Sequence, residues 1–193
     1  DRSDGKSRCR KKHHNPEDAK VVLFAPTFRE GAKDGKRFVF SEIWTIDFQR
    51  LLDNLQKKFG GTWYLCVRVH PQLAPTFQEY KNAEIQDRII DESQADDMYE
   101  ILAGMDAYIS DYSSACFEAG FAHIPVFLYA DDIQKYAKDR GALMWNIATD
   151  PRERIGNNKI MTPNFDVKLP FTLASDNEEL EKDIMEFNKA KYD

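Results

Sequence analysis

Two adjacent serines follow a predicted strand and begin a predicted helix. The apolar run Ala107–Ile109 predicts the strand, and Ser113 and Ser114 come after the turn that ends it. The first turn of a helix leaves about four backbone N–H groups unpaired and carries a partial positive charge. Hydroxyls placed there make an anion site that fits a phosphate. The alternative is an ordinary helix cap, which Ser forms in many proteins.

A carboxylate lies one helical turn beyond these serines. Glu118 is four residues after Ser114, so the two share one face of the predicted helix. Its oxygens can accept hydrogen bonds from the hydroxyls of a sugar next to the phosphate, which favours a nucleotide as the ligand. The alternative is a solvated surface residue.

Cationic and polar side chains follow two other predicted strands. Thr27 and Arg29 come after the first strand, while Arg68 and His70 lie at the end of the second. A guanidinium can hold a phosphate through two parallel hydrogen bonds, and an imidazole can stabilise charge on a leaving group. The arginines and His70 also have structural alternatives: a salt bridge for each arginine, and the role of a structural hydrogen-bond donor for His70.

Other catalytic signatures are weak in this sequence. The acidic pairs Asp96–Asp97 and Asp131–Asp132 lie at predicted helix starts, where capping explains them better than a metal site does. A phosphate-binding P-loop and a Gly-x-Gly-x-x-Gly fingerprint are both missing, and Ser113 lacks the Gly-x-Ser-x-Gly setting of a nucleophile. Binding is therefore a better prediction than covalent catalysis, and no metal is expected.

The elements that position these residues alternate along the chain. Apolar runs predict strands at 21–25, 63–69, 88–90, 107–110 and 125–129, and helices are predicted at 47–59, 97–104, 114–122, 131–138 and 177–191. Loops are expected at 31–41, which is rich in Gly and Lys, and at 150–169. The alternation predicts a doubly wound parallel α/β sheet with helices on both faces. Ligands of such sheets bind beyond the carboxyl ends of the strands, where the polar residues should converge.

Composition sets the broad class. The 193 residues are 42% hydrophobic and 31% charged, with a formal net charge of -6, which is typical of a soluble globular protein and argues against non-specific nucleic-acid binding. No apolar run approaches the roughly 20 residues of a membrane helix, and no signal peptide is evident. Three widely spaced cysteines predict a reducing compartment.

The N-terminal segment differs from the remainder of the chain. Residues 1–19 carry a run of Arg and Lys and are predicted to be a basic linker or tail, while 20–193 form the ligand-binding domain. Attraction to an anionic membrane surface is the functional alternative for the basic run.

Four segments, in this order, resemble the CDP-glycerol glycerophosphotransferases that polymerise teichoic acids and related bacterial capsular polymers. They are Phe24-Ala25-Pro26-Thr27-Phe28-Arg29, Arg68-Val69-His70-Pro71, Ile109-Ser110-Asp111-Tyr112-Ser113-Ser114 and Tyr136-Ala137-Lys138-Asp139-Arg140-Gly141. The resemblance spans about Val21 to Trp145. It implies the Rossmann-like C-terminal half of a GT-B glycosyltransferase fold.

The resemblance also implies site roles. Ser113 and Ser114, with Thr27, Arg29 and Arg68, would hold the diphosphate of a CDP-linked donor. His70 would be the catalytic group that stabilises charge or the leaving group, Glu118 would bind the ribose, and Asp111 would brace the turn. Arg140 is given no role.

The implied reaction transfers a polyol phosphate from CDP-glycerol or CDP-ribitol to a growing polymer and releases CMP. No cofactor is required, and a missing N-terminal domain would hold the acceptor and the general base, so these residues alone should be inactive. The expected location is the cytoplasm, with possible peripheral contact at the inner face of the membrane. Two alternatives stay open: a GT-B enzyme that uses a UDP-sugar, and a non-catalytic α/β module that binds Mg²⁺ near Asp111.

Overall fold

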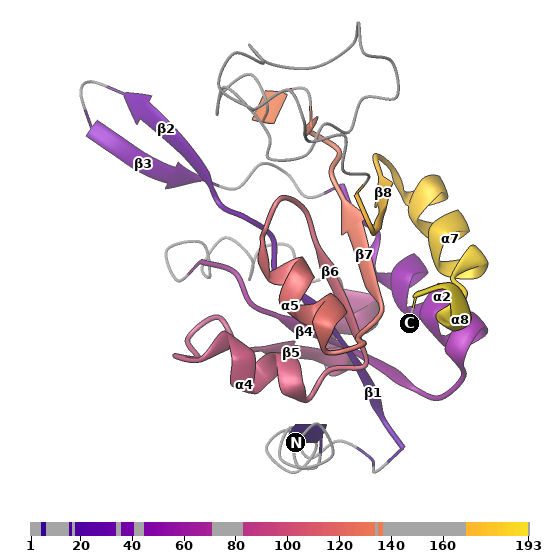
Figure 1. The fold of residues 1–193 in the computed structure, drawn as a ribbon. Helices are drawn as coiled ribbons and strands as arrows, with labels where there is room; N and C mark the ends of the chain where they lie inside the picture. Colours follow the sequence, from indigo (N-terminus) through magenta and orange to yellow (C-terminus); the bar gives the residue numbers. More distant parts are fainter. Residues whose placement is uncertain are drawn as a thin grey trace, which may run out of the picture.

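A six-stranded parallel sheet forms the centre of the protein (Figure 1). The computed structural model describes residues 5–6, 16, 18–33, 36–40, 45–70, 83–133, 135–136 and 169–192. The strand order is β5-β4-β1-β6-β7-β8. The strands are β1 (Lys20–Phe24), β4 (Trp63–Val67), β5 (Ile89–Asp91), β6 (Ala107–Ser110), β7 (Val126–Tyr129) and β8 (Thr172–Ala174). The predicted strands are therefore confirmed, because each apolar run supplies one strand of the sheet.

Helices cover both faces of the sheet. Figure 1 shows α2 (Phe48–Phe59) and α7 (Asn177–Glu186) on one side and α4 (Met98–Ala103) and α5 (Ala115–Phe121) on the other. Side chains alternate along a strand, so Val22 and Phe24 pack toward α2 while Val21 and Leu23 face the opposite core. The doubly wound α/β class predicted from the sequence is confirmed.

Local signals in the sequence set the helix ends. Asp47 caps α2 by accepting a hydrogen bond from Arg50 N at 3.0 Å, and Gly60 ends it with a φ of 69°. Asp97 likewise caps α4 by accepting from Tyr99 N and Glu100 N. The capping interpretation is confirmed for Asp97.

Two predictions, the 31–41 loop and the C-terminal helix, were incomplete or wrong, and two short elements were not predicted. The stretch predicted as a loop at 31–41 lies largely in an antiparallel hairpin, β2 (Arg29–Lys33) and β3 (Lys36–Phe40), which projects from the sheet in Figure 1. Strand β8 was missed because three residues carry too little pattern, and its pairing with β7 defines it. The C-terminal helix is interrupted at Phe187 and continues as α8 (Lys189–Tyr192). A short 3-10 helix, η2 (Ala83–Arg88), precedes β5.

Only Gly5, Lys6, Pro16, Asp18 and Ala19 of the basic N-terminal segment lie within the described residues. A side chain at Gly5 would approach the backbone of Ala103 to 2.9 Å, so the segment passes closely over the end of α4. Lys6 forms an ion pair with Asp106. These two residues are docked on the domain rather than solvated. Within the described ranges, no helix is long and apolar enough to cross a membrane.

Candidate functional site

The strand order creates a crevice between β1 and β6. The chain runs from β1 to β4 and β5 on one side, and then from β6 to β7 and β8 on the other. The loops that leave β1 and β6 therefore part at this point, which is where open α/β sheets bind ligands. Thr27 and Asp111 lie just beyond these two strand ends.

Asp111 joins the two loops at this crevice. Its Oδ1 accepts hydrogen bonds from Thr27 N at 2.8 Å and from Tyr112 N at 2.7 Å. The Ser110 hydroxyl donates to Ala25 O at 2.7 Å beneath it. The backbone after β1 is thus fixed relative to the turn before α5.

Arg29 lies between two carboxylates. Its Nε and Nη2 donate to Asp132 Oδ2 and Oδ1 at 2.8 and 2.9 Å, in the bidentate arrangement that a phosphate could also accept. Its Nη1 donates to Asp111 Oδ2 at 2.9 Å and to Thr27 O. The guanidinium is therefore engaged by protein groups on both of its edges.

Two aromatic rings complete this cluster. Tyr112 donates to Asp132 Oδ1 at 2.8 Å and stacks on Tyr136 with ring centroids 3.8 Å apart. The Arg29 guanidinium lies 5.1 Å from the Tyr112 ring and 4.7 Å from the Tyr136 ring, within cation–π range. We call Thr27, Arg29, Asp111, Tyr112, Asp132 and Tyr136 the Arg29 cluster.

Charges in the Arg29 cluster stabilise one another. Burial lowers the pKa of Arg29, but hydrogen bonds and attraction from Asp132 and Asp111 outweigh it and raise that pKa above its ordinary value. Burial raises the pKa of Asp132, but the hydrogen bonds from Arg29 and Tyr112 lower it by more. The pKa of Asp132 therefore lies below its ordinary range. Burial, with the neighbouring Asp132, raises the pKa of Tyr112. The ion pairs are thus the stable state at neutral pH.

Arg68 is far less engaged than Arg29. Its Nη2 donates to Ala95 O at 3.2 Å, and its buried Nε has no hydrogen-bond partner among the described residues. Its backbone N donates to Phe24 O at 2.9 Å, which places it directly beside the end of β1. A buried N–H without a partner is costly, and a bound anion would satisfy it.

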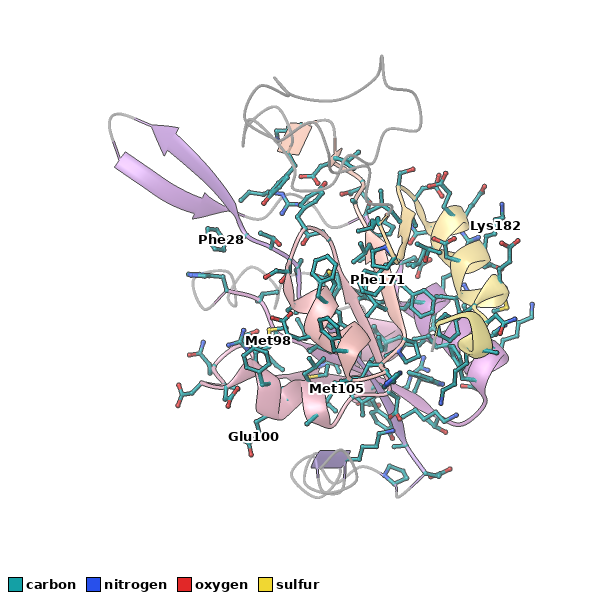
Figure 2. All side chains as sticks on the ribbon, viewed as in Figure 1. Phe28, Met98, Glu100, Met105, Phe171 and Lys182 are labelled. Atoms are coloured by element: carbon teal, nitrogen blue, oxygen red, sulfur yellow. The ribbon has the colours of Figure 1, made fainter. Side chains whose placement is uncertain are left out.

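His70 follows on the same strand end. Its ring centroid is 5.0 Å from that of Phe28, which comes directly after Thr27. Figure 2 shows Phe28 where the chain leaves the sheet toward the hairpin. The contact therefore places His70 at the same edge as Thr27 and Arg68. The buried Thr27 Oγ1 also finds no hydrogen-bond partner in the described part of the chain.

The serines lie at the start of α5, as predicted. Ser114 occupies the N-cap position without a capping hydrogen bond from its side chain in the described structure, and it is exposed. The Ser113 hydroxyl accepts from Ala115 N at 3.3 Å instead. Glu118 is exposed on the same short helix. The Ser114 hydroxyl is thus not used by the helix cap.

Buried groups under this helix are poor nucleophiles. Burial, and then the nearby charge of Glu118, raises the pKa of the Cys116 thiol to about 11. Burial raises the pKa of Tyr108 to about 12, although the Ser110 and Ser113 side chains oppose the change. Both groups stay protonated near neutral pH, so neither offers an anionic nucleophile.

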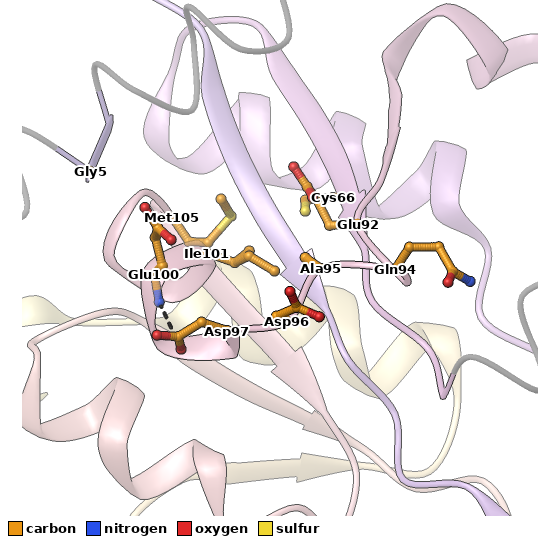
Figure 3. Close-up of a pocket in the computed structure, with 10 residues that line it drawn as sticks. All are labelled: Gly5, Cys66, Glu92, Gln94, Ala95, Asp96, Asp97, Glu100, Ile101 and Met105. Carbon is orange, nitrogen blue, oxygen red and sulfur yellow. Dashed lines mark hydrogen bonds between the residues drawn. The ribbon is translucent and has the colours of Figure 1, made fainter.

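A pocket of 480 Å³ lies beside α4 (Figure 3), and one of its lining residues, Ala95, accepts the hydrogen bond from Arg68. In that view the Asp97 side chain lies at the helix start and accepts a hydrogen bond from Glu100 N. Across the described ranges, no group of three or more His, Cys, Asp or Glu side chains is placed to hold a metal ion. The pocket is lined by Gly5, Cys66, Glu92, Gln94, Ala95, Asp96, Asp97, Glu100, Ile101 and Met105.

Sequence reasoning missed part of the Arg29 cluster. Asp132 was expected to cap a helix, but its side chain binds Arg29 and Tyr112 instead. Its neighbour Asp131 accepts a hydrogen bond from Thr45. No local signal reveals the Arg29–Asp132 pair, because the partners are 103 residues apart. Arg140 and most of the fourth family-like segment lie outside the described residues.

The fold and this edge define a Rossmann-like α/β domain with cations and hydroxyls at its switch-point crevice. Residues 1–161 match the family described as CDP-Glycerol:Poly(glycerophosphate) glycerophosphotransferase. The chain therefore belongs to this family, and the predicted resemblance is confirmed.

Relatives and solved structures agree with this assignment. The chain is 32% identical to a teichoic acid poly(glycerol phosphate) polymerase of Staphylococcus epidermidis, over 70% of this chain and 18% of that protein. It is 29% identical to a teichoic acid glycerol-phosphate primase of Bacillus spizizenii, over 68% of this chain and 31% of that protein. The solved wall teichoic acid polymerase TagF is 26% identical with a TM-score of 0.63, covering 98% of this chain and 40% of that one. The chain thus spans less than half the length of these proteins.

Proposed function

We propose that this chain is the donor-nucleotide-binding part of an enzyme that transfers a polyol phosphate from a CDP-alcohol to a teichoic acid or capsular polymer, with release of CMP. The observation that carries the proposal is the meeting of Thr27, Arg68 and His70 at one edge of the sheet in a chain of this family. A solved variant of TagF soaked with CDPG is 26% identical to this chain, with a TM-score of 0.61. That relationship supports a cytidine diphosphate as the donor.

The donor diphosphate would lie over the crevice between β1 and β6. Arg68 supplies an under-used guanidinium, and Thr27 and Ser114 supply hydroxyls. Ser113 adds a further hydroxyl, and His70 stabilises charge as the bond to CMP breaks. Glu118 accepts hydrogen bonds from the ribose on the outer side of α5.

The reaction is attack by an acceptor hydroxyl on the β-phosphate of the donor. The described residues can position the diphosphate and stabilise its charge, which is the main protein contribution in phosphoryl transfer. The acceptor and the general base belong to another domain in this proposal. No cofactor takes part.

Titration calorimetry on the full-length protein tests this function. CDP-glycerol or CDP-ribitol should bind more tightly than CMP, and UDP should bind weakly. A full-length protein without affinity for any cytidine nucleotide refutes the proposal, whereas a preference for UDP supports the UDP-sugar alternative.

We also propose that residues 1–19 form a basic tail or linker to the donor domain at 20–193, and that it brings the enzyme to the inner face of the cell membrane from the cytoplasm. The basic run carries the charge that anionic lipids attract, although Lys6 already pairs with Asp106. Liposome sedimentation should show binding that rises with the anionic lipid content. Binding that is independent of lipid charge contradicts this location.

A further inference from the structure

The Arg29 cluster has the wrong charge balance for a direct phosphate site. One guanidinium faces two carboxylates, with side-chain exposures of 15% for Arg29, 5% for Asp111 and 10% for Asp132. Because the cluster contains one more negative than positive group, a diphosphate placed against it would be repelled at short range.

Turning Arg29 toward a ligand would also cost much free energy, because its present ion pairs would have to break. Its Nε and Nη2 edge is filled by Asp132, and its Nη1 is shared by Asp111 and Thr27 O. Withdrawal would leave two largely buried carboxylates without their counter-ion, which is the costly way to break a buried ion pair.

The contacts of the cluster connect three strand ends instead. Arg29 follows β1, Asp111 follows β6 and Asp132 follows β7. Through Asp111, the same network fixes Thr27 N and Tyr112 N, which flank the crevice on both sides. A shift of Asp132 would therefore move the Thr27 loop and the turn that carries Ser113.

We propose that Asp132, Tyr112 and Tyr136 are positioning residues for the donor diphosphate, acting through Arg29 and Asp111. Asp132 holds the guanidinium by a bidentate pair, Tyr112 holds Asp132, and Tyr136 covers Tyr112. Arg29 is then a strut between loops, while the direct phosphate contacts come from Arg68 and the hydroxyls. The proposal rests on the proposed function, because it concerns the same donor site.

Opposite outcomes separate a strut from a ligand at Arg29. If Arg29 bound the diphosphate directly, Asp132→Asn would free the Nε and Nη2 edge of the guanidinium and remove a negative charge that repels the ligand. The donor affinity would then stay the same or increase. If Arg29 is a strut, the same substitution weakens donor binding about tenfold, as expected for the loss of a charged hydrogen bond. Cytidine, which has no phosphate, should bind nearly as before.

The experiment measures CDP-glycerol and cytidine affinity of the full-length protein by calorimetry, together with its thermal unfolding. Asp131→Asn is the matched control, because that neighbouring exposed carboxylate contacts Thr45 rather than Arg29, and its donor affinity should not change. Arg29→Lys should bind the donor more weakly than the wild type although it keeps the positive charge, since an ammonium cannot form the forked pair with Asp132. Combining Asp132→Asn with Arg29→Gln should weaken binding no further than Arg29→Gln alone.

Tyr112→Phe is the second variant should Asp132→Asn fail to fold. It removes one hydrogen bond to Asp132 and should weaken donor binding about threefold with little change in unfolding temperature. The positioning role is overturned if Asp132→Asn and Tyr112→Phe both leave the donor affinity unchanged. If Asp132→Asn does not fold, an unchanged donor affinity in Tyr112→Phe alone overturns it. A wild-type protein that binds no CDP-linked donor instead refutes the proposed function.

Discussion

The two arginines at this edge of the sheet differ in how fully other protein groups pair with them. Arg29 is held by two carboxylates and flanked by two aromatic rings, whereas Arg68 donates one hydrogen bond to a carbonyl and keeps a buried Nε without a partner in the described structure. A cation whose hydrogen-bond donors are already paired with protein groups holds the surrounding loops in place. A cation that is desolvated and underpaired has capacity left for a ligand.

The largest expected difference between the two arginines is in stability. Arg29→Gln should lower the free energy of unfolding by about 3–5 kcal/mol, because it leaves the largely buried carboxylates of Asp111 and Asp132 without a counter-ion. Arg68→Gln should lower it by less than about 1 kcal/mol, since only one hydrogen bond is lost. Urea unfolding of both variants measures the contrast, and equal losses would contradict it.

Donor affinity should show the reverse contrast. Arg68→Ala should weaken CDP-glycerol binding about 10–100-fold, the loss of one or two charged hydrogen bonds, and should weaken CMP less. Ser114→Ala should also weaken CDP-glycerol binding more than CMP binding, but by a smaller factor. Arg50→Ala is the control, because Arg50 pairs with Glu181 on the surface of α2. If calorimetry finds no change for Arg68→Ala and Ser114→Ala, the phosphate assignment fails.

Acid should weaken the Arg29 cluster selectively. The pKa of Asp132 is lower in the folded protein than in the unfolded chain, so its stabilising contribution is complete above its ordinary pKa of about 4. That contribution is lost as the pH falls through the lower folded value. Unfolding followed from pH 6 to pH 2 should therefore be less pH-dependent in Asp132→Asn than in wild type. A matching pH profile in the two proteins would show that Asp132 contributes little.

The smallest effect is expected at Glu118. Glu118→Gln should change the free energy of unfolding by no more than about 0.5 kcal/mol, because the side chain is exposed. Loss of the charged acceptor should weaken cytidine and CDP-glycerol equally, by about threefold to tenfold. Glu178→Gln on α7 is an exposed control away from the crevice. Calorimetry that finds a loss for CDP-glycerol alone, with cytidine unchanged, would contradict the ribose assignment of Glu118.

Much of the fold could be predicted from local sequence. Continuous apolar runs identified five of the six strands of the sheet, and the 3.6-residue period with Asp47 and Gly60 indicated the limits of α2. The hairpin was missed because its first strand, Arg29–Lys33, has no apolar alternation. Strand β8 depends on its pairing with β7 rather than on its own residues. Such elements form through tertiary context, which local propensity does not contain.

The sequence predicted which residues reach this edge of the sheet, but not how they contact one another there. Parallel strands place their carboxyl ends at one edge, so Thr27, Arg68, His70 and Ser113 could be expected there together. What each does at that edge depends on contacts with distant loops. The sequence left a salt bridge open for Arg29, and the resemblance implied a diphosphate ligand; the structure places Asp132 and Asp111 beside it.

The sequence by itself determined the doubly wound sheet, the ends of α2, the cap of α4 and the family, because apolar periodicity, capping residues and short ordered motifs are local properties. Only the tertiary structure decided which arginine is paired and which retains hydrogen-bonding capacity. The partners of Arg29 lie 82 and 103 residues along the chain, and only folding brings the ends of β6 and β7 to the end of β1. Charge pairing depends on distance in space and on burial, and neither is encoded at a single position.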